Sequence, residues 1–269
     1  MKKVLVVHYS QSGQLDSVVK EFTRPLVESD DISVTFDNIR PVNDFPFPWP
    51  FFTFLDTFPE CVYQDAPPIH DPQISGEEDF DLVVLAYQVW FLSPSLPMTA
   101  FLQHPVAGKL LKGKPVVTLI ACRNMWLMAQ EDMKTRLAEL DANLVGNVAM
   151  VDEAGSVLSF FATPLWVLTG HKGPFWGGLI PRAGVAEKEI AASERFGRRI
   201  RDRFQFRGEV SADMFHGLSA VSINAGLISS EKTAKRAFRL WGKLFRSLGP
   251  RGAWQRKPLV AFYSVFLIA

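Results

Sequence analysis

Cysteine is scarce in this chain, which has two among its 269 residues. Cys61 and Cys122 have neither the spacing of metal ligands nor that of a disulfide framework, so no metal site is expected. Cys122 ends an apolar run and is expected to be a buried thiol. Sparse, unpaired cysteine favours a reducing compartment, and we expect a cytoplasmic protein.

The most hydrophobic segments are too short to cross a membrane. The uncharged segment Ala154–Gly170 has 17 residues and Pro258–Ala269 has 12, whereas a spanning helix needs ~20. The first apolar run, Val4–Val7, is too short for a signal peptide and has no small-residue cleavage site. We therefore interpret Val4–Val7 as a first strand.

Motifs that would define a nucleophile or a metal centre are also missing. The chain has no Gly-x-Ser-x-Gly sequence, and its five histidines are scattered without a metal-ligand or Ser-His-Asp pattern. His8 ends the first strand and is expected to be partly buried there, where it could lie near a ligand. Catalytic residues therefore stay unassigned.

The net charge of +1 hides an asymmetry. Residues 182–257 carry 17 Lys and Arg against 7 Asp and Glu, whereas the rest of the chain carries 12 against 21. This distribution indicates either two surfaces with different partners or a solvated basic helix. Nucleic acid is not an expected partner, because no recognition motif accompanies the charge.

Strand and helix patterns alternate along the first two hundred residues. Buried-strand patterns fall at Val4–Val7, Ile32–Phe36, Asp81–Tyr87, Pro115–Ala121 and Asn143–Met150, and helical spacing falls at 15–27, 96–103, 127–140 and 185–204. This order predicts an α/β fold with a doubly wound, parallel five-stranded sheet. Ligands of such folds bind beyond the carboxyl ends of the strands, which here means the turns after residues 8, 87 and 121.

Several segments are additional to a minimal fold of this kind. We expect a domain over 1–204 with apolar insertions at about 40–78 and 154–183, followed by a helical extension over 205–269. The prolines of Arg40–Pro59 are predicted to exclude regular structure there. Residues 45–58 of this segment and residues 154–180 would form a lid or wall around a long apolar substrate, with core packing or a dimer interface as the alternative.

A phosphate-binding turn is predicted between the first strand and the first helix. It reads Ser10-Gln11-Ser12-Gly13-Gln14. Free N–H groups and the helix dipole favour an anion there, serine hydroxyls add donors, and Gly13 lets the backbone approach closely. Because the turn has no Lys or Arg, it suits a phosphate monoester rather than a nucleoside triphosphate. An ordinary serine-capped helix is the alternative.

This turn resembles that of the flavodoxin and NAD(P)H:quinone reductase superfamily, whose pattern is Ser/Thr-x-Ser/Thr-Gly-x-Thr. Here the last position is Leu15, which removes one hydroxyl. The resemblance implies a flavodoxin-like fold that holds FMN non-covalently, with the flavin phosphate in this turn.

Two further loops resemble those that contact the flavin ring in that superfamily. The resemblance implies that the first loop sets aromatic rings beside the flavin, and that Arg123 of the second could stabilise the reduced ring, flanked by Trp126. The alternatives are core packing for Trp90 and a surface position for Arg123. The implied ring contacts are Gln88, Val89, Trp90 and Phe91 of the first loop and Cys122, Arg123, Asn124 and Trp126 of the second.

The opening sequence, residues 2–15, also resembles the bacterial dialkylresorcinol-condensing enzyme family. That resemblance implies a role in making resorcinol lipids from acyl precursors. The residues themselves indicate flavin redox chemistry rather than condensation. We therefore expect an FMN-dependent oxidoreductase acting on an apolar, quinone-like or polyketide-derived substrate, with NAD(P)H as donor. The alternatives are an electron-transfer or partner module, and a scaffold with an empty flavin site.

The C-terminal extension predicts a basic amphipathic helix. Cations and apolar residues interleave over 232–248, and an uncharged end follows from Pro258. Such a helix can lie on an anionic membrane, which would place the protein peripherally on the inner face. Packing on the domain or on a second subunit, as in a homodimer, is the alternative.

Overall fold

The protein has a parallel sheet wound on both faces by helices, in a computed structural model that describes residues 1–152 and 155–268. The six-stranded sheet has the order β2-β1-β3-β5-β6, with β4 paired to β3. Its strands are β1 (Lys2–His8), β2 (Ile32–Asn38), β3 (Leu82–Trp90), β4 (Ser93–Pro94), β5 (Pro115–Cys122) and β6 (Asn143–Val151). Without the two-residue β4, which pairs antiparallel with the end of β3, this is the flavodoxin-like order 2-1-3-4-5. The predicted fold class is confirmed.

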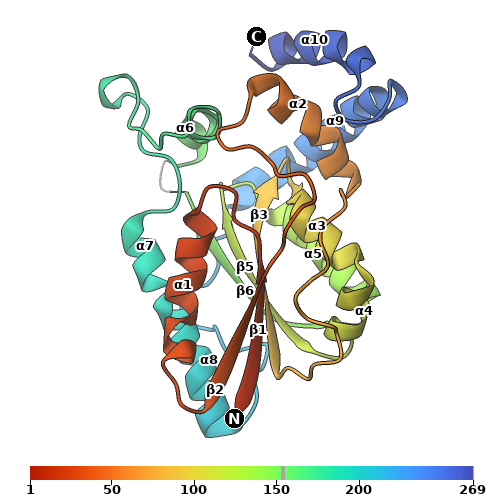
Figure 1. Cartoon of the computed structure of the whole chain (residues 1–269). Coiled ribbons are helices and arrows are strands. Elements are labelled where there is room, and N and C mark those ends of the chain that lie inside the picture. The colour runs from red at the N-terminus through yellow and green to blue at the C-terminus, as the bar shows by residue number, and fades with distance from the viewer. Residues whose placement is uncertain (153–154, 269) are drawn as a thin grey trace.

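Each central strand is apolar on both faces because both faces are covered. In β1, Leu5 and Val7 enter one core and Val4 and Val6 enter the other, and all four are fully buried. Helices lie on either side of the sheet (Figure 1). The first core includes residues of α3 (Leu96–Gln103), α4 (Pro105–Leu111) and α5 (Leu127–Glu139), and the second includes residues of α1 (Gln14–Val27), α7 (Glu187–Ala192) and α8 (Glu194–Arg207).

The helix predicted over 185–204 is divided into α7 and α8 at Ser193. The buried Ser193 hydroxyl donates to the Ile190 carbonyl at 2.6 Å. The amides of Ser193 and Phe196 bond three residues back rather than four. This tighter turn ends the first helix.

The prediction that prolines exclude regular structure from Arg40–Pro59 was wrong, because α2 spans Phe51–Tyr63. Pro50 lies at the N-cap with φ −62°, where a proline costs no helical hydrogen bond. Pro59 lies inside the helix, but Leu55, Phe58 and Val62 are buried against the C-terminal helices. Burial of this apolar face outweighs the lost bond.

The apolar insertion after β6 is also helical. Helix α6 spans Gly155–Thr169, followed by the short η1 (Trp176–Gly178). Ala162 and Trp166 pack with Ile180 and Ala183 in a small separate cluster. Two of the segments predicted from sequence have one end residue outside the described residues. These end residues are Ala154 and Ala269.

The C-terminal helices pack on α2 (Figure 1). After η2 (Ala225–Leu227), α9 spans Ile228–Ser247, and η3 (Trp254–Arg256) leads into α10 (Lys257–Ile268). Their shared cluster consists of Leu55, Phe58, Val62, Phe245, Val260 and Tyr263. Packing on the domain, one of the alternatives for this extension, is thus observed. Over the described part of the chain, no helix combines the length and apolarity needed to cross a bilayer.

Candidate functional site

The candidate site lies where the chain reverses its direction of winding. Strands β1 and β3 are neighbours, yet α1 follows β1 on one face of the sheet and α3 follows β3 on the other. Crevices at such switch points are the usual ligand sites of open α/β sheets. The turn after β1 and the loops after β3 and β5 all end at this carboxyl edge.

The turn after β1 has the form of an anion cradle. Gly13 is the N-cap of α1 with φ 78°, and no side chain caps the helix, so the serine-capped alternative is not realised. The Ser10 hydroxyl is buried and has no hydrogen-bond partner among the described residues. A side chain built on Gly13 would meet nothing within 4 Å, which leaves the first turn of α1 open. A buried hydroxyl without a partner is costly unless a ligand or an ordered water accepts its hydrogen bond.

The next two residues of the predicted site have structural side chains. Gln14 accepts from the Val185 amide at 3.1 Å and donates to the Val185 carbonyl at 3.4 Å, tying α1 to the segment before α7. Leu15 is fully buried in the core. Only their backbone amides can face the turn. His8 lies beside the same helix, with Nε2 3.4 Å from the Asp16 carboxylate.

Trp90 and Phe91 point into different clusters. The Trp90 ring lies edge-on to Tyr9 at 6.1 Å, Phe45 at 5.0 Å and Trp49 at 5.7 Å between centroids. Phe91 has φ 48°, and its ring instead contacts Phe54 and Phe238 between α2 and α9.

The side chains of Trp90 and Phe91 therefore do not form one ring platform. Trp90 stays half-buried beside the turn, and Gln88 accepts from the Gln11 amide at 3.4 Å. Val89 is also half-buried. The loop after β3 thus contacts the turn after β1 through Gln88 and Trp90.

The loop after β5 places a cation near the sheet edge. Arg123 is half-buried, so it is not a fully solvated surface residue. Burial lowers its pKa, while the nearby Asp152 opposes that shift. Asn124 is half-buried in the same loop. Trp126 is buried in the core at the start of α5. Cys122 is half-buried rather than fully buried as predicted, and its surroundings still raise the pKa of the thiol well above the ordinary value.

Two residues of α9 fix these loops, and no motif in the sequence marks them for this role. Glu231 is fully buried and accepts from the Met128 amide at 2.9 Å and from the Leu127 and Trp126 amides. Lys235 donates to the Leu92 carbonyl and the Ser93 hydroxyl, both at 2.7 Å.

Lys235 also has an ionic partner, which is half-buried. Lys235 forms an ion pair with Asp132 of α5, and burial lowers its pKa. Burial raises the pKa of Glu231. One helix turn of α9 thus holds the loops after β3 and β5 together. We call Glu231 and Lys235 the α9 clamp.

Solved structures with a similar arrangement include flavoproteins. A flavoprotein from Lactobacillus acidophilus NCFM in complex with FMN is 17% identical, covering 55% of this chain and 93% of its own, with a TM-score of 0.42. The Trp repressor binding protein from Bacillus subtilis is 9% identical, covering 72% and 98%, with a TM-score of 0.36. No protein-family model and no curated protein matches the chain. The strand order itself assigns the flavodoxin-like fold.

Proposed function

We propose that this protein binds FMN non-covalently at the β1/β3 switch point and uses it to reduce an apolar, quinone-like substrate. The observation that carries the proposal is the buried Ser10 hydroxyl without a partner, in a turn that Gly13 opens at the start of α1. A phosphate oxygen would accept from Ser10, from Ser12 and from the backbone amides at the start of α1.

The neutral donor set suits a phosphate monoester. The turn contains no cation, and the Asp16 carboxylate in the first turn of α1 lies 3.4 Å from Nε2 of His8. Arg123 would face the flavin ring from the loop after β5, and its charge would stabilise a reduced, anionic ring. The half-buried Trp90 would border the ring from the opposite loop.

When bound, FMN supplies hydride transfer. In the proposed net reaction, NAD(P)H gives two electrons and one proton, a second proton comes from solvent, and a quinone becomes a hydroquinone. The chain's own part is to anchor the phosphate, hold the two ring loops through the α9 clamp and surround the substrate with apolar side chains.

The raised pKa values of the two thiols favour flavin redox chemistry over condensation. Burial raises the pKa of both Cys61 and Cys122, so neither thiol offers the thiolate that acyl transfer would need. A role on a resorcinol-lipid pathway, implied by the family resemblance, would accordingly be an oxidation or reduction of the ring.

Titration of the purified protein with FMN tests the site. Replacing both serines (Ser10→Ala and Ser12→Ala) should weaken FMN binding about 10- to 100-fold, since each hydroxyl would donate to a charged oxygen. The matched control Ser230→Ala, exposed at the start of α9, should bind as the parent does. Equal FMN affinity in the double variant would contradict the phosphate assignment.

Turnover separates an enzyme from a carrier. With FMN bound, steady oxidation of NAD(P)H in the presence of a quinone supports the oxidoreductase. Tight FMN binding without turnover would instead identify an electron-transfer or partner module.

We also propose that α9 contacts anionic membranes peripherally. The contact would be made by its exposed cations rather than by its aromatic face. Phe238, Trp241 and Phe245 are packed within the molecule, so the exposed face offers cations beside Leu240 and Leu244. Vesicles containing phosphatidylglycerol should pull down the protein in low salt and vesicles of phosphatidylcholine should not.

A further inference from the structure

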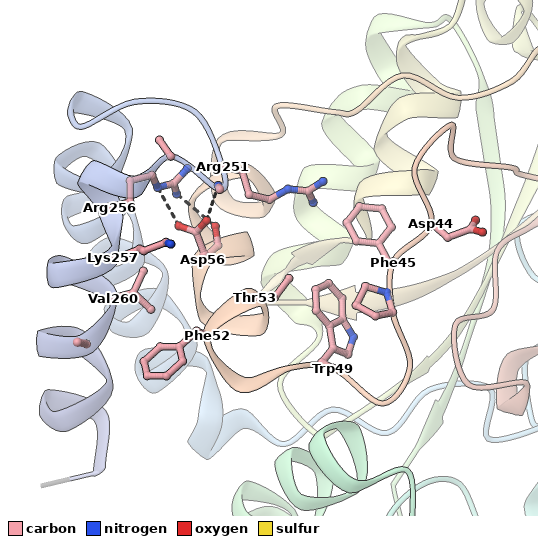
Figure 2. A pocket seen from close by; sticks show the side chains of 14 residues that line it. Asp44, Phe45, Trp49, Phe52, Thr53, Asp56, Arg251, Arg256, Lys257 and Val260 are labelled. Atoms are coloured by element: carbon pink, nitrogen blue, oxygen red, sulfur yellow. Dashed lines mark hydrogen bonds and ion pairs between the residues drawn. The ribbon is translucent and has the colours of Figure 1, made fainter.

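A cavity of about 640 Å³ lies outside the flavin site, between the loop before α2 and the connector from α9 to α10. Its volume falls within the ~300–1,000 Å³ typical of small-molecule sites. Figure 2 shows the side chains that surround it. The residues of its walls come from 44–56 on one side and 251–261 on the other.

The walls of the cavity are mainly apolar and aromatic. Phe45 and Trp49 form one wall, and Phe52 and Val260 stand on the other side (Figure 2). Phe45 and Trp49 are buried by the rest of the fold, whereas Phe52 is 58% exposed. The exposure of Phe52 marks an apolar entrance that nothing in the described chain covers.

Two cations at the cavity have no ionic partner among the described residues. Arg251 reaches across the space with its guanidinium 5.0 Å from the centre of the Phe45 ring. Lys257, at the start of α10, is exposed on the same border. Neither of the two forms an ion pair with a described residue.

The third cation of the lining is already neutralised. Arg256 is fully buried and pairs with Asp56 at 2.9 Å and Glu60 at 2.8 Å. Asp56 also accepts from the Gly252 amide at 2.6 Å.

Asp44 also lines the cavity, with its carboxylate directed away from Arg251 and Lys257 (Figure 2). Asp56, the partner of Arg256, lies close enough to Arg251 to interact with its charge. The positive charge that faces a ligand therefore comes from Lys257 and from Arg251, beside an apolar chamber.

We propose that this cavity binds an amphiphilic anion, namely a long-chain carboxylate whose head pairs with Arg251 and Lys257 and whose chain lies against Trp49, Phe52 and Val260. Neutral apolar molecules would leave the two cations without a partner, and small hydrophilic anions would leave the apolar walls in water. The arrangement fits a ligand that carries both properties.

The cavity shares its inner wall with the candidate flavin site. Phe45 and Trp49 contact the cavity on one side and the Trp90 ring on the other. Pro46 also accepts from the Gln11 side chain at 2.9 Å. A carboxylate in the cavity would thus be separated from the turn by one layer of aromatic side chains. Its binding could respond to a change in the turn, but it does not require FMN.

Calorimetric titration with dodecanoate, below its micelle concentration, tests the proposal on the full chain. We expect one site per chain. Decanoate should bind about 15-fold more weakly, because each methylene changes affinity about fourfold. Dodecanol should bind at least about tenfold more weakly than dodecanoate, because it lacks the charge-assisted bonds.

Variants assign the binding to this cavity. The pair Arg251→Gln and Lys257→Gln should weaken dodecanoate about tenfold or more and leave dodecanol unchanged. The pair Lys232→Gln and Lys243→Gln removes the same charge from exposed positions of α9 and should bind as the parent does. Thr53→Trp should occlude the chamber and abolish binding, with Ala261→Trp as a second occlusion if the first variant does not fold.

Two results would overturn the proposal. One is equal affinity for dodecanol and dodecanoate, and the other is binding that survives the occluding variants. FMN titration of the same variants distinguishes failure of the cavity proposal from failure of the FMN proposal. A variant that loses carboxylate binding but keeps the FMN affinity of the parent has a defect in the cavity alone.

Discussion

At the residue scale, Gly197 of α8 allows two helix backbones to touch. A Cβ at this position would lie 1.9 Å from the Phe22 carbonyl oxygen of α1. Gly197→Ala should therefore lower the free energy of unfolding by about 1–3 kcal/mol, since α8 must move away from α1.

A denaturant titration measures this effect, and Gly108→Ala is its control. Gly108 lies inside α4, and a Cβ there meets nothing within 4 Å. The control should be unchanged or about 0.5–1 kcal/mol more stable, because alanine favours the helix. A loss at Gly108 as large as that at Gly197 would show that the close approach is not the cause.

Asp81 gives the fold a pH-dependent contact. Burial alone would raise its pKa, but bonds from the Lys2 side chain and the Lys3 amide, both at 2.8 Å, outweigh burial and lower it. A lowered folded pKa stabilises the protein above the ordinary carboxyl value and loses that contribution as the pH falls through the folded value.

Asp81→Asn should cost about 1 kcal/mol at pH 7, a modest figure because the side chain is partly solvated. The difference from the parent should shrink below about pH 4, where the parent carboxylate takes up a proton. Thermal unfolding of both proteins across this pH range measures it. A pH-independent difference would mean that the carboxylate charge is not involved.

Residues of the site were predictable from sequence only where their geometry is local. The turn from Ser10 to Gly13 follows from one strand, one glycine and one helix start, all within a few residues. Phe91 and Trp126 were predicted as ring contacts, but their side chains are directed by α2, α9 and the core, which lie far along the sequence. Spacing within a loop does not contain that information.

At the element scale, periodicity predicted the strands and most helices. It did not predict which element packs on the apolar face of each helix. The apolar face of α9 was interpreted as a membrane face, whereas α2 and α10 occupy it. Helix α2 was missed because its prolines were weighed without the apolar surface that it buries. Both cases depend on partners distant in sequence.

The α9 clamp should be detectable without any cofactor. Glu231→Gln removes the charge that holds the start of α5, so the amides of Trp126, Leu127 and Met128 should exchange hydrogen about 10- to 100-fold faster. Hydrogen exchange measured by NMR or mass spectrometry checks this. Lys232→Gln, one residue away and exposed, is the control and should leave exchange at α5 unchanged.

At the scale of the whole molecule, one buried arginine joins the C-terminal helices to the α/β domain. Arg256→Met would leave Asp56 and Glu60 buried without a cation and should lower the free energy of unfolding by about 3–5 kcal/mol at pH 7. Burial already raises the pKa of Asp56, and loss of Arg256 would raise it further. The variant should therefore recover stability relative to the parent as the pH falls towards 4.

Neutralising the two acids provides the matching control. Asp56→Asn and Glu60→Gln, added to Arg256→Met, should restore part of the lost stability at pH 7. No recovery by either route would show that packing of the arginine side chain, rather than its charge, joins the two parts.

The position of the clamp along the chain has a consequence for biosynthesis. The turn and both loops of the candidate site are made within the first 130 residues, whereas the side chains that hold those loops belong to a helix that begins at Ile228. Once the chain has been made to about residue 220, both cores of the sheet are complete, but its carboxyl edge still lacks Glu231 and Lys235. The site is finished only when the last helices dock, so a nascent chain released early would carry the fold without the completed site.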